Sequence, residues 1–306
     1  MLVSFPVSGV ETYLWLPPLV AFVVSFVASM AGVSGAFLLL PFQMSVLGFT
    51  SPAVSPTNLV FNVVGIPAGV WRYIREGRMV WPLALTMLIA SLPGVVVGGL
   101  LRLSLLPDPR SFKLFVASVL LYIGARLAWG GWRLEAHSVG PGPPSAREVQ
   151  DWTVHVEHMS PRVLRFRFRG ESHTCSPTII AGLCILVGVV GGAYGVGGGA
   201  LLAPILIGVM RLPVHAVAGA TLLSTFGTSI CGVLFYQVVA LWYVGQGDGV
   251  APDWLLGSLL GVGGLAGIYL GARVQRFVPA RWLKLVLAAL ILYVASSYTM
   301  AFFPTV

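Results

Sequence analysis

Long apolar stretches constrain the fold of this chain more than any other feature of its sequence. The stretches that exceed the roughly 18 residues needed to cross a bilayer lie at 79–101, 111–131, 216–243, 252–273 and 281–303. Only 9% of the residues are charged, against about 25% in an ordinary soluble domain. That is too few to cover a surface in water, so the sequence predicts an all-α polytopic membrane protein.

An internal duplication is the second constraint. A shift of 163 positions places residues 20–73 on 183–236 without a gap, with glycine, proline and tyrosine positions in register. Each half begins with a long apolar stretch that glycines interrupt, and three spans follow it. The interrupted stretches are 14–48 and 177–210, and the spans are about 53–74, 79–101 and 111–131, then about 214–243, 252–273 and 281–303. We therefore expect a first transmembrane repeat at 1–131 and a second at 177–306.

The connecting segment 132–176 is basic, with seven arginines from Arg126 to Arg169. Membrane proteins concentrate Lys and Arg on the cytoplasmic side, so we interpret these charges as an orientation signal and not as a nucleic-acid site. The predicted location is the inner (plasma) membrane, with this loop in the cytoplasm. Period-two alternation at 152–156 and 163–169 favours a small β-hairpin within it.

The two repeats are either parallel or inverted, depending on whether each interrupted stretch crosses once or returns as a hairpin. The segments after the interruptions, 36–48 and 199–210, are too short to span. Inverted repeats also leave only Arg102, Arg110 and Lys113 outside the cell. These observations favour inverted repeats with both termini outside, each a glycine-broken helical hairpin plus three transmembrane helices.

The glycine breaks are the predicted binding site. Irregular backbone survives in a membrane only beside protein or a polar cavity, and a half-helix that begins there has unpaired N–H groups and the positive end of its dipole. Such an end binds an oxyanion without a buried cation. The residues expected to form it are Gly32, Val33, Ser34 and Gly35 in the first break, and Gly195, Val196, Gly197, Gly198 and Gly199 in the second.

Polar side chains in the following spans extend this prediction. Asn58 with Asn62, and Thr221 with Thr225, recur at four-residue spacing and so share a helix face. We expect their side chains, with Ser224 and more weakly Gln43, to complete the shell around an anion; helix–helix hydrogen bonding is the alternative. Every Asp and Glu falls at a span end or in a loop, which argues against a cation pump or channel. The Cys and His spacing predicts no metal site and no cofactor.

At these residues the sequence resembles the sulfite exporter family, the TauE/SafE type of transport protein. The second copy, GVVGGAYGVGGGALLAPILIGVMRLPVHAVAGATLLSTFGTS, matches that pattern closely, whereas the first copy has Ser34 and Ala36 where glycine is usual. The resemblance covers both repeats but not 132–176. It implies that the protein exports a small sulfur oxyanion or organosulfonate such as sulfite.

Other functions stay open at this point. A passive anion channel fits the same features, and the GVSG pattern at 32–35 permits an intramembrane serine protease, for which His215 is the one histidine outside the loop. A scaffold that binds partners through 132–176 is a third alternative. We predict a transporter and not an enzyme, embedded in lipid, with homo-oligomers possible. The first eleven residues contain no Lys or Arg, so no cleaved signal peptide is expected.

Overall fold

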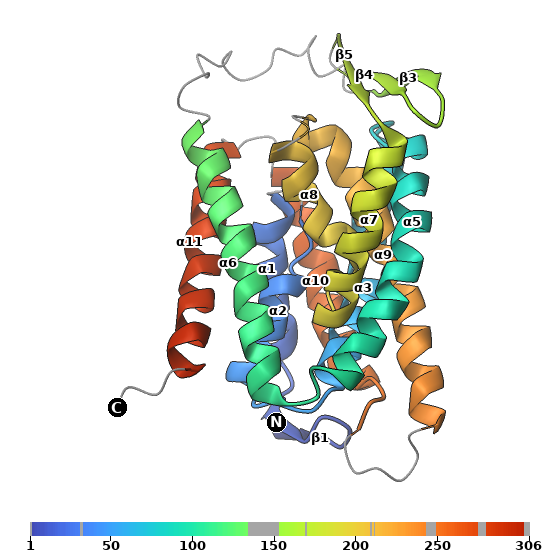
Figure 1. Ribbon diagram of the computed structural model, residues 1–306. Coiled ribbons are helices and arrows are strands. Elements are labelled where there is room, and N and C mark those ends of the chain that lie inside the picture. Colours follow the sequence, from blue (N-terminus) through green and yellow to red (C-terminus); the bar gives the residue numbers. More distant parts are fainter. Residues whose placement is uncertain are drawn as a thin grey trace.

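A computed structural model describes residues 2–30, 33–133, 153–168, 170–208, 210, 212–242, 249–274 and 280–302. This part of the chain is mostly helical (Figure 1). The helices of the first half are α1 (Leu16–Met30), α2 (Ala36–Ser45), α3 (Val54–Gly65), α4 (Pro67–Arg75), α5 (Trp81–Ser104) and α6 (Pro109–Arg133). Those of the second half are α7 (Pro177–Tyr194), α8 (Gly198–Gly208), α9 (Val214–Trp242), α10 (Trp254–Val274) and α11 (Ala280–Phe302).

Helix interruptions occur where the sequence places glycine or proline. The expected breaks separate α1 from α2 and α7 from α8. One interruption was not predicted: the span expected at 53–74 is two helices that meet at Ile66. Pro67, the first residue of α4, has no N–H to continue the helical bonding of α3, which explains the division. The corresponding α9 is continuous from Val214 to Trp242.

Four helices in the described part of the chain are long and apolar enough to cross a membrane. They are α5, α7, α10 and the portion of α9 from Ala216 to Trp242. Helices α1 and α2 are apolar but shorter. The portion of α11 from Ala288 to Met300 is likewise apolar but shorter, and α11 packs against α6. A polytopic membrane protein is the architecture that accommodates these helices.

Glycine allows the closest helix contacts. Helix α5 packs on α7, and α1 packs on α10. A Cβ atom on Gly98 of α5 would lie 2.1 Å from the Val189 carbonyl oxygen of α7, and one on Gly271 of α10 would lie 2.4 Å from the Phe26 carbonyl oxygen of α1. These separations are too short for any side chain, so both small-residue pairs, Gly94/Gly98 and Gly267/Gly271, serve backbone-to-backbone packing.

An N-terminal hairpin, absent from the sequence-based expectations, covers one end of the bundle. Strand β1 (Leu2–Phe5) pairs antiparallel with β2 (Val10–Tyr13), and Phe5 is fully buried. The buried Asp253 accepts hydrogen bonds from Ser8 N (3.2 Å) and Ser8 Oγ (2.8 Å), and its other oxygen caps α10 by accepting from Leu256 N at 3.0 Å. Asp253 thus lies at a span end, and it fixes the hairpin to α10.

A three-stranded sheet lies at the opposite end of the bundle from β1 and the end of α11 (Figure 1). Strands β3 (His155–Met159), β4 (Leu164–Phe168) and β5 (Glu171–Cys175) are antiparallel in that order. The expected hairpin corresponds to β3 and β4, while β5 was missed because its sequence, ESHTC, has no apolar alternation. Trp152 and Arg169, included in the expectation, lie outside the described residues. The buried face of β4 joins the hydrophobic core around α4 and α5.

Replacing Gly98 with alanine should separate α5 from α7. The added methyl group would occupy the space of the Val189 carbonyl and the Ala193 N–H group, so backbone must move. We expect the free energy of unfolding to fall by about 1–3 kcal/mol, measured by denaturant titration in detergent micelles. Gly182→Ala on α7 is the matched control, because nothing lies within 4 Å of a Cβ placed there. Equal stabilities of the two variants would contradict this packing.

The thiol of Cys175 should be nearly inert while the sheet is folded. Burial raises the pKa of this thiol to about 11, so at pH 8 it is almost entirely protonated and cannot act as a nucleophile. In a chain whose two other cysteines are alanine, we expect alkylation by iodoacetamide at pH 8 to be at least about tenfold slower than that of an exposed cysteine introduced by Thr174→Cys with Cys175→Ser. Equal rates would show that Cys175, at the end of β5, is not buried.

Candidate functional site

The second glycine break is a tight turn between α7 and α8. Gly195 ends α7 in the left-handed conformation (φ 79°, ψ 29°), and Gly197 has φ 83°. The Gly191 carbonyl accepts the N–H groups of Gly195, Val196 and Gly197 at 2.9, 3.0 and 3.3 Å. A Cβ on Gly195 would lie 2.6 Å from the Cα of Ser55 on α3, so glycine is required both for its φ and for its small size.

The first break has a different construction. Gly35 precedes α2 with an ordinary helical φ of −67°, and the hydroxyl of Ser34 accepts the Ala36 N–H at 3.3 Å. The Val33 N–H donates to the Ala28 carbonyl at 3.2 Å, which closes the end of α1. Gly32, the first residue of the expected site, lies outside the described residues. Ser34 therefore supplies a hydroxyl group where the second break uses glycine conformations alone.

Two asparagines of α3 join the breaks. The amide Nδ2 of Asn58 donates to the Ala36 carbonyl at 3.0 Å and to the Gly195 carbonyl at 2.9 Å. Asn62 donates through Nδ2 to the Val196 carbonyl at 2.9 Å and accepts from the Ser34 hydroxyl at 2.7 Å. The two halves of the sequence therefore meet at these side chains.

Gln43 completes this group, which we call the central cluster: Ser34, Gln43, Asn58 and Asn62 with the carbonyls of Ala36, Gly195 and Val196. The Gln43 Nε2 donates to Asn58 Oδ1 at 3.2 Å. All four side chains are at most 1% exposed. A buried carbonyl without a partner costs about 1–3 kcal/mol, so the two asparagines stabilise the breaks as well as joining them.

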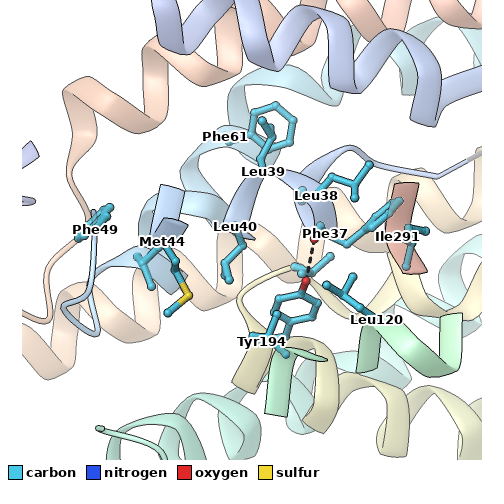
Figure 2. Packing of buried hydrophobic residues seen from close by; sticks show 14 of the residues in the cluster. Phe37, Leu38, Leu39, Leu40, Met44, Phe49, Phe61, Leu120, Tyr194 and Ile291 are labelled. Carbon is cyan, nitrogen blue, oxygen red and sulfur yellow. Dashed lines mark hydrogen bonds between the residues drawn. The ribbon is translucent and has the colours of Figure 1, made fainter. Parts of the chain in front are cut away.

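Helix α2 is also held to the second break by a tyrosine. The Tyr194 hydroxyl, at the end of α7, donates to the Phe37 carbonyl of α2 at 2.7 Å (Figure 2). Both residues belong to an apolar cluster with Leu38, Leu39 and Leu40. The central cluster is therefore enclosed on this side by hydrocarbon, which strengthens the hydrogen bonds within it.

The polar face of α9 lies against the start of α8. The hydroxyls of Thr221 and Thr225 donate back to carbonyls of their own helix, those of Ala218 (3.0 Å) and Thr221 (2.8 Å). A Cβ on Gly199 would lie 2.6 Å from Thr225 Oγ1, so α8 and α9 are in close contact here. The expected threonine donors are thus beside the break but are occupied by α9 itself.

The expectation of bare amide groups needs correction. The Gly198 N–H donates to the Thr228 hydroxyl at 3.1 Å, the N–H groups of 195–197 donate to Gly191, and that of Ala36 donates to Ser34. In this conformation these five N–H groups have acceptors within the protein. An anion that binds at these amides must first displace such internal acceptors.

Unpaired donors near the breaks are serine hydroxyls instead. In the described part of the chain, the buried hydroxyls of Ser25, Ser91, Ser224 and Ser229 have no hydrogen-bond partner. A Cβ on Gly35 would lie 2.9 Å from Ser25 Oγ, and one on Gly198 would lie 3.0 Å from Ser91 Oγ. Ser224 was predicted; the other three were not, because isolated serines in apolar helices are usually structural.

Sequence reasoning also missed a buried cation. From the sequence, Arg102 is expected on the outer side of the membrane, and no role is predicted for it. In the structure it is fully buried in the last turn of α5, and its Nε donates to Ser55 Oγ at 3.4 Å. The signal in the sequence was its position at the edge of an apolar stretch, directly after Leu100 and Leu101. The prediction that the site works without a buried cation is therefore incomplete.

The geometry gives no support to an intramembrane serine protease with Ser34 as its nucleophile. The hydroxyl of Ser34 donates its hydrogen bond to the amide oxygen of Asn62, and an amide oxygen is not a base that could activate a serine. The side chain of His215 lies outside the described residues. Among the residues that are described, no three His, Cys, Asp or Glu side chains are grouped to hold a metal ion.

An apolar helical bundle, with two interrupted helices that meet at a buried polar cluster, defines a polytopic membrane protein of the transporter class. The family model described as "Sulfite exporter TauE/SafE" matches residues 18–298. The chain belongs to this family, as its glycine-rich repeats suggested.

Two curated relatives agree with that assignment. A "Probable membrane transporter protein" of Xylella fastidiosa (strain Temecula1) is 24% identical over 89% of this chain and 90% of its own length. The "Probable membrane transporter protein y4hK" of Sinorhizobium fredii (strain NBRC 101917 / NGR234) is 22% identical over 89% of this chain and 92% of its own. No solved structure matches the chain.

A double-mutant cycle should detect the contact between Ser34 and Asn62. We expect Ser34→Ala and Asn62→Ala to show a coupling energy of about 0.5–3 kcal/mol in the free energy of unfolding, because each removes the same 2.7 Å hydrogen bond. Thr86→Ala combined with Ser34→Ala is the control, since the Thr86 hydroxyl bonds within its own helix to Pro82. Additivity of the Ser34 and Asn62 changes would contradict the predicted link.

Proposed function

We propose that this membrane transporter moves a small anion, and that the anion is a sulfur oxyanion or organosulfonate such as sulfite, in the direction of export. Membership of the sulfite exporter TauE/SafE family supports the substrate class. The two relatives are named only as probable membrane transporter proteins, so the support for an anionic substrate within that class comes from the chemistry of the site.

The central cluster is the observation that carries the proposal. It is built from amide and hydroxyl groups at the place where both interrupted helices meet, and among the described residues no carboxylate pairs with them. Neutral N–H and O–H donors, together with the N-terminal dipoles of α2 and α8, favour an anion over a cation. The unpaired hydroxyls of Ser25, Ser91 and Ser224 supply further donors.

An inverted arrangement of the two repeats fits the packing. The α5–α7 contact corresponds under the duplication to the α10–α1 contact, and the α3–α10 contact corresponds to α9–α5. The end of α11 and β1 lie at one end of the bundle, and β3–β5 lie at the other (Figure 1). We assign the β3–β5 end, with its basic strand β4, to the cytoplasm, and the other end to the outside of the plasma membrane.

A carrier fits the site better than a passive channel. The cluster side chains are at most 1% exposed, so an anion reaches them only after the surrounding helices move. Carriers of this kind expose a central site to one side at a time. Export needs no dedicated coupling residue, because an anion that leaves a cell with a negative interior gains about 2.3 kcal/mol per charge per 100 mV.

Tracer flux in proteoliposomes tests the proposal. We expect saturable, voltage-dependent movement of one or more of sulfite, thiosulfate, sulfate, sulfoacetate and taurine, and accelerated exchange when the same anion is present on the opposite side. Asn58→Ala should reduce the flux at least about tenfold, since it removes hydrogen bonds to both breaks. Gly198→Leu should abolish it, because a Cβ there would already lie 2.9 Å from Ser91 Cβ.

Gly182→Leu is the matched control for Gly198→Leu, because a Cβ placed at Gly182 meets nothing within 4 Å. It should leave the flux unchanged. Flux that rises linearly to high anion concentration would favour a channel. Absence of flux for all five compounds with folded protein, or flux that is indifferent to both site substitutions, would overturn the proposed function.

A further inference from the structure

Arg102 is an arginine buried without a carboxylate partner. Its side chain is fully buried, and no Asp or Glu oxygen in the described part of the chain forms an ion pair with it. The other buried arginine, Arg78, is paired with Glu76. A buried guanidinium group that lacks a counter-ion is unfavourable, so a charge of opposite sign supplied by a ligand is the natural compensation.

The contacts of Arg102 leave one side of the guanidinium group open. Its Nη1 donates to the Leu106 carbonyl, its Nε donates to Ser55 Oγ, and the ring of Phe112 covers one face with 3.7 Å between the guanidinium carbon and the ring centroid. In the described structure the buried Nη2 has no hydrogen-bond partner. Nη2 is therefore a charged donor without an acceptor.

A second unpaired group lies on the helix that packs against α5 here. The Tyr236 side chain on α9 is 1% exposed, and its hydroxyl has no hydrogen-bond partner among the described residues. One turn before Arg102, a Cβ on Gly99 would lie 2.5 Å from the ring of Phe235, so α5 and α9 are in close contact at this level. A hydroxyl can donate to an anion as the guanidinium does. Two orphaned donors from different helices, one of them charged, form a place for an acceptor that carries negative charge.

The same group is connected to the central cluster. Ser55, which accepts from Arg102, lies against Gly195, since a Cβ on that glycine would be 2.7 Å from Ser55 Cβ. Ser55 also lies one helical turn before Asn58 on α3, so both share a helix face. Ser55 therefore connects Arg102 to the second glycine break, by a hydrogen bond on one side and close packing on the other.

We propose that Nη2 of Arg102 and the hydroxyl of Tyr236 form a second oxyanion subsite, displaced from the central cluster toward the end of the bundle that carries β1. It takes the same class of ligand as the central cluster, an oxyanion with at least two acceptor oxygens, and holds it at the step between the cluster and that face of the membrane. This inference rests on the proposed transport of an anion. An arginine that only fixes the Leu106 carbonyl is the alternative that the experiment separates from it.

The experiment compares the anion concentration at half-maximal flux in proteoliposomes, using the transported anion identified among sulfite, thiosulfate, sulfate, sulfoacetate and taurine. Arg102→Gln should raise this concentration about tenfold or more, because a charge-assisted hydrogen bond is lost. Arg102→Lys, which keeps the charge but not the forked geometry, should raise it less. Tyr236→Phe should raise it severalfold with an unchanged unfolding midpoint, since its hydroxyl has no partner in the described structure.

Arg110→Gln is the matched control, because Arg110 is exposed in the first turn of α6 near the same end of the bundle. It should leave the half-saturating concentration unchanged. If Arg102→Gln does not fold, Arg102→Lys and Tyr236→Phe carry the test. Wild-type half-saturating concentrations for these two variants, in a protein that does transport, would overturn the subsite and leave the proposed function standing. A folded wild-type protein that moves none of the anions would overturn both.

Discussion

Every backbone N–H and C=O group placed in hydrocarbon needs a partner inside the protein, and this requirement governs the centre of the molecule. The break between α7 and α8 leaves the carbonyls of Gly195 and Val196 outside any helix, and two asparagines of α3 donate to them; Asn58 donates to the Ala36 carbonyl of α2 as well. Helices α2, α9 and α10 are packed around α3 by glycine contacts and apolar side chains. The polar cluster and the hydrocarbon around it are therefore parts of one arrangement.

The two halves meet this requirement by different chemistry despite their related sequences. The first half contributes asparagine side chains that cross to the second break, whereas the second half uses threonines that bond mainly to their own helix and cap Gly198. Left-handed glycines occur at the second break, at Gly195 and Gly197, while Ser34 supports the first. Related backbone segments of the two halves are thus stabilised by different side chains, and the hydrogen-bond donors of the central cluster are not arranged symmetrically.

Hydropathy and glycine spacing were sufficient to predict a mostly helical fold with breaks before α2 and α8, because the bilayer sets helix length and glycine marks irregular backbone. The common helix face of Asn58 and Asn62 could be predicted as well, but not that both donate to the carbonyls of the second break. The hydrogen-bond partners of these polar side chains could not be predicted, because they depend on which hydroxyl and carbonyl groups lie within about 3 Å after folding. For the same reason the burial of Arg102 and the division at Pro67 were missed: the first depends on tertiary packing, and the second on one proline in an otherwise apolar span.

Because of that proline, the span that follows α2 is divided, whereas the corresponding span that follows α8 is continuous. Helix α9 is one rod of 29 residues, but α3 and α4 are joined at a single residue, Ile66, where the hydrogen-bond ladder is interrupted. The loop after α4 is attached to the sheet domain, because the Gly77 carbonyl accepts the Val154 N–H at 3.0 Å. The first half of the sequence therefore has a helix joint at Ile66, close to a loop that is hydrogen-bonded to the segment leading into β3. The corresponding helix of the second half, α9, is continuous and has no such joint.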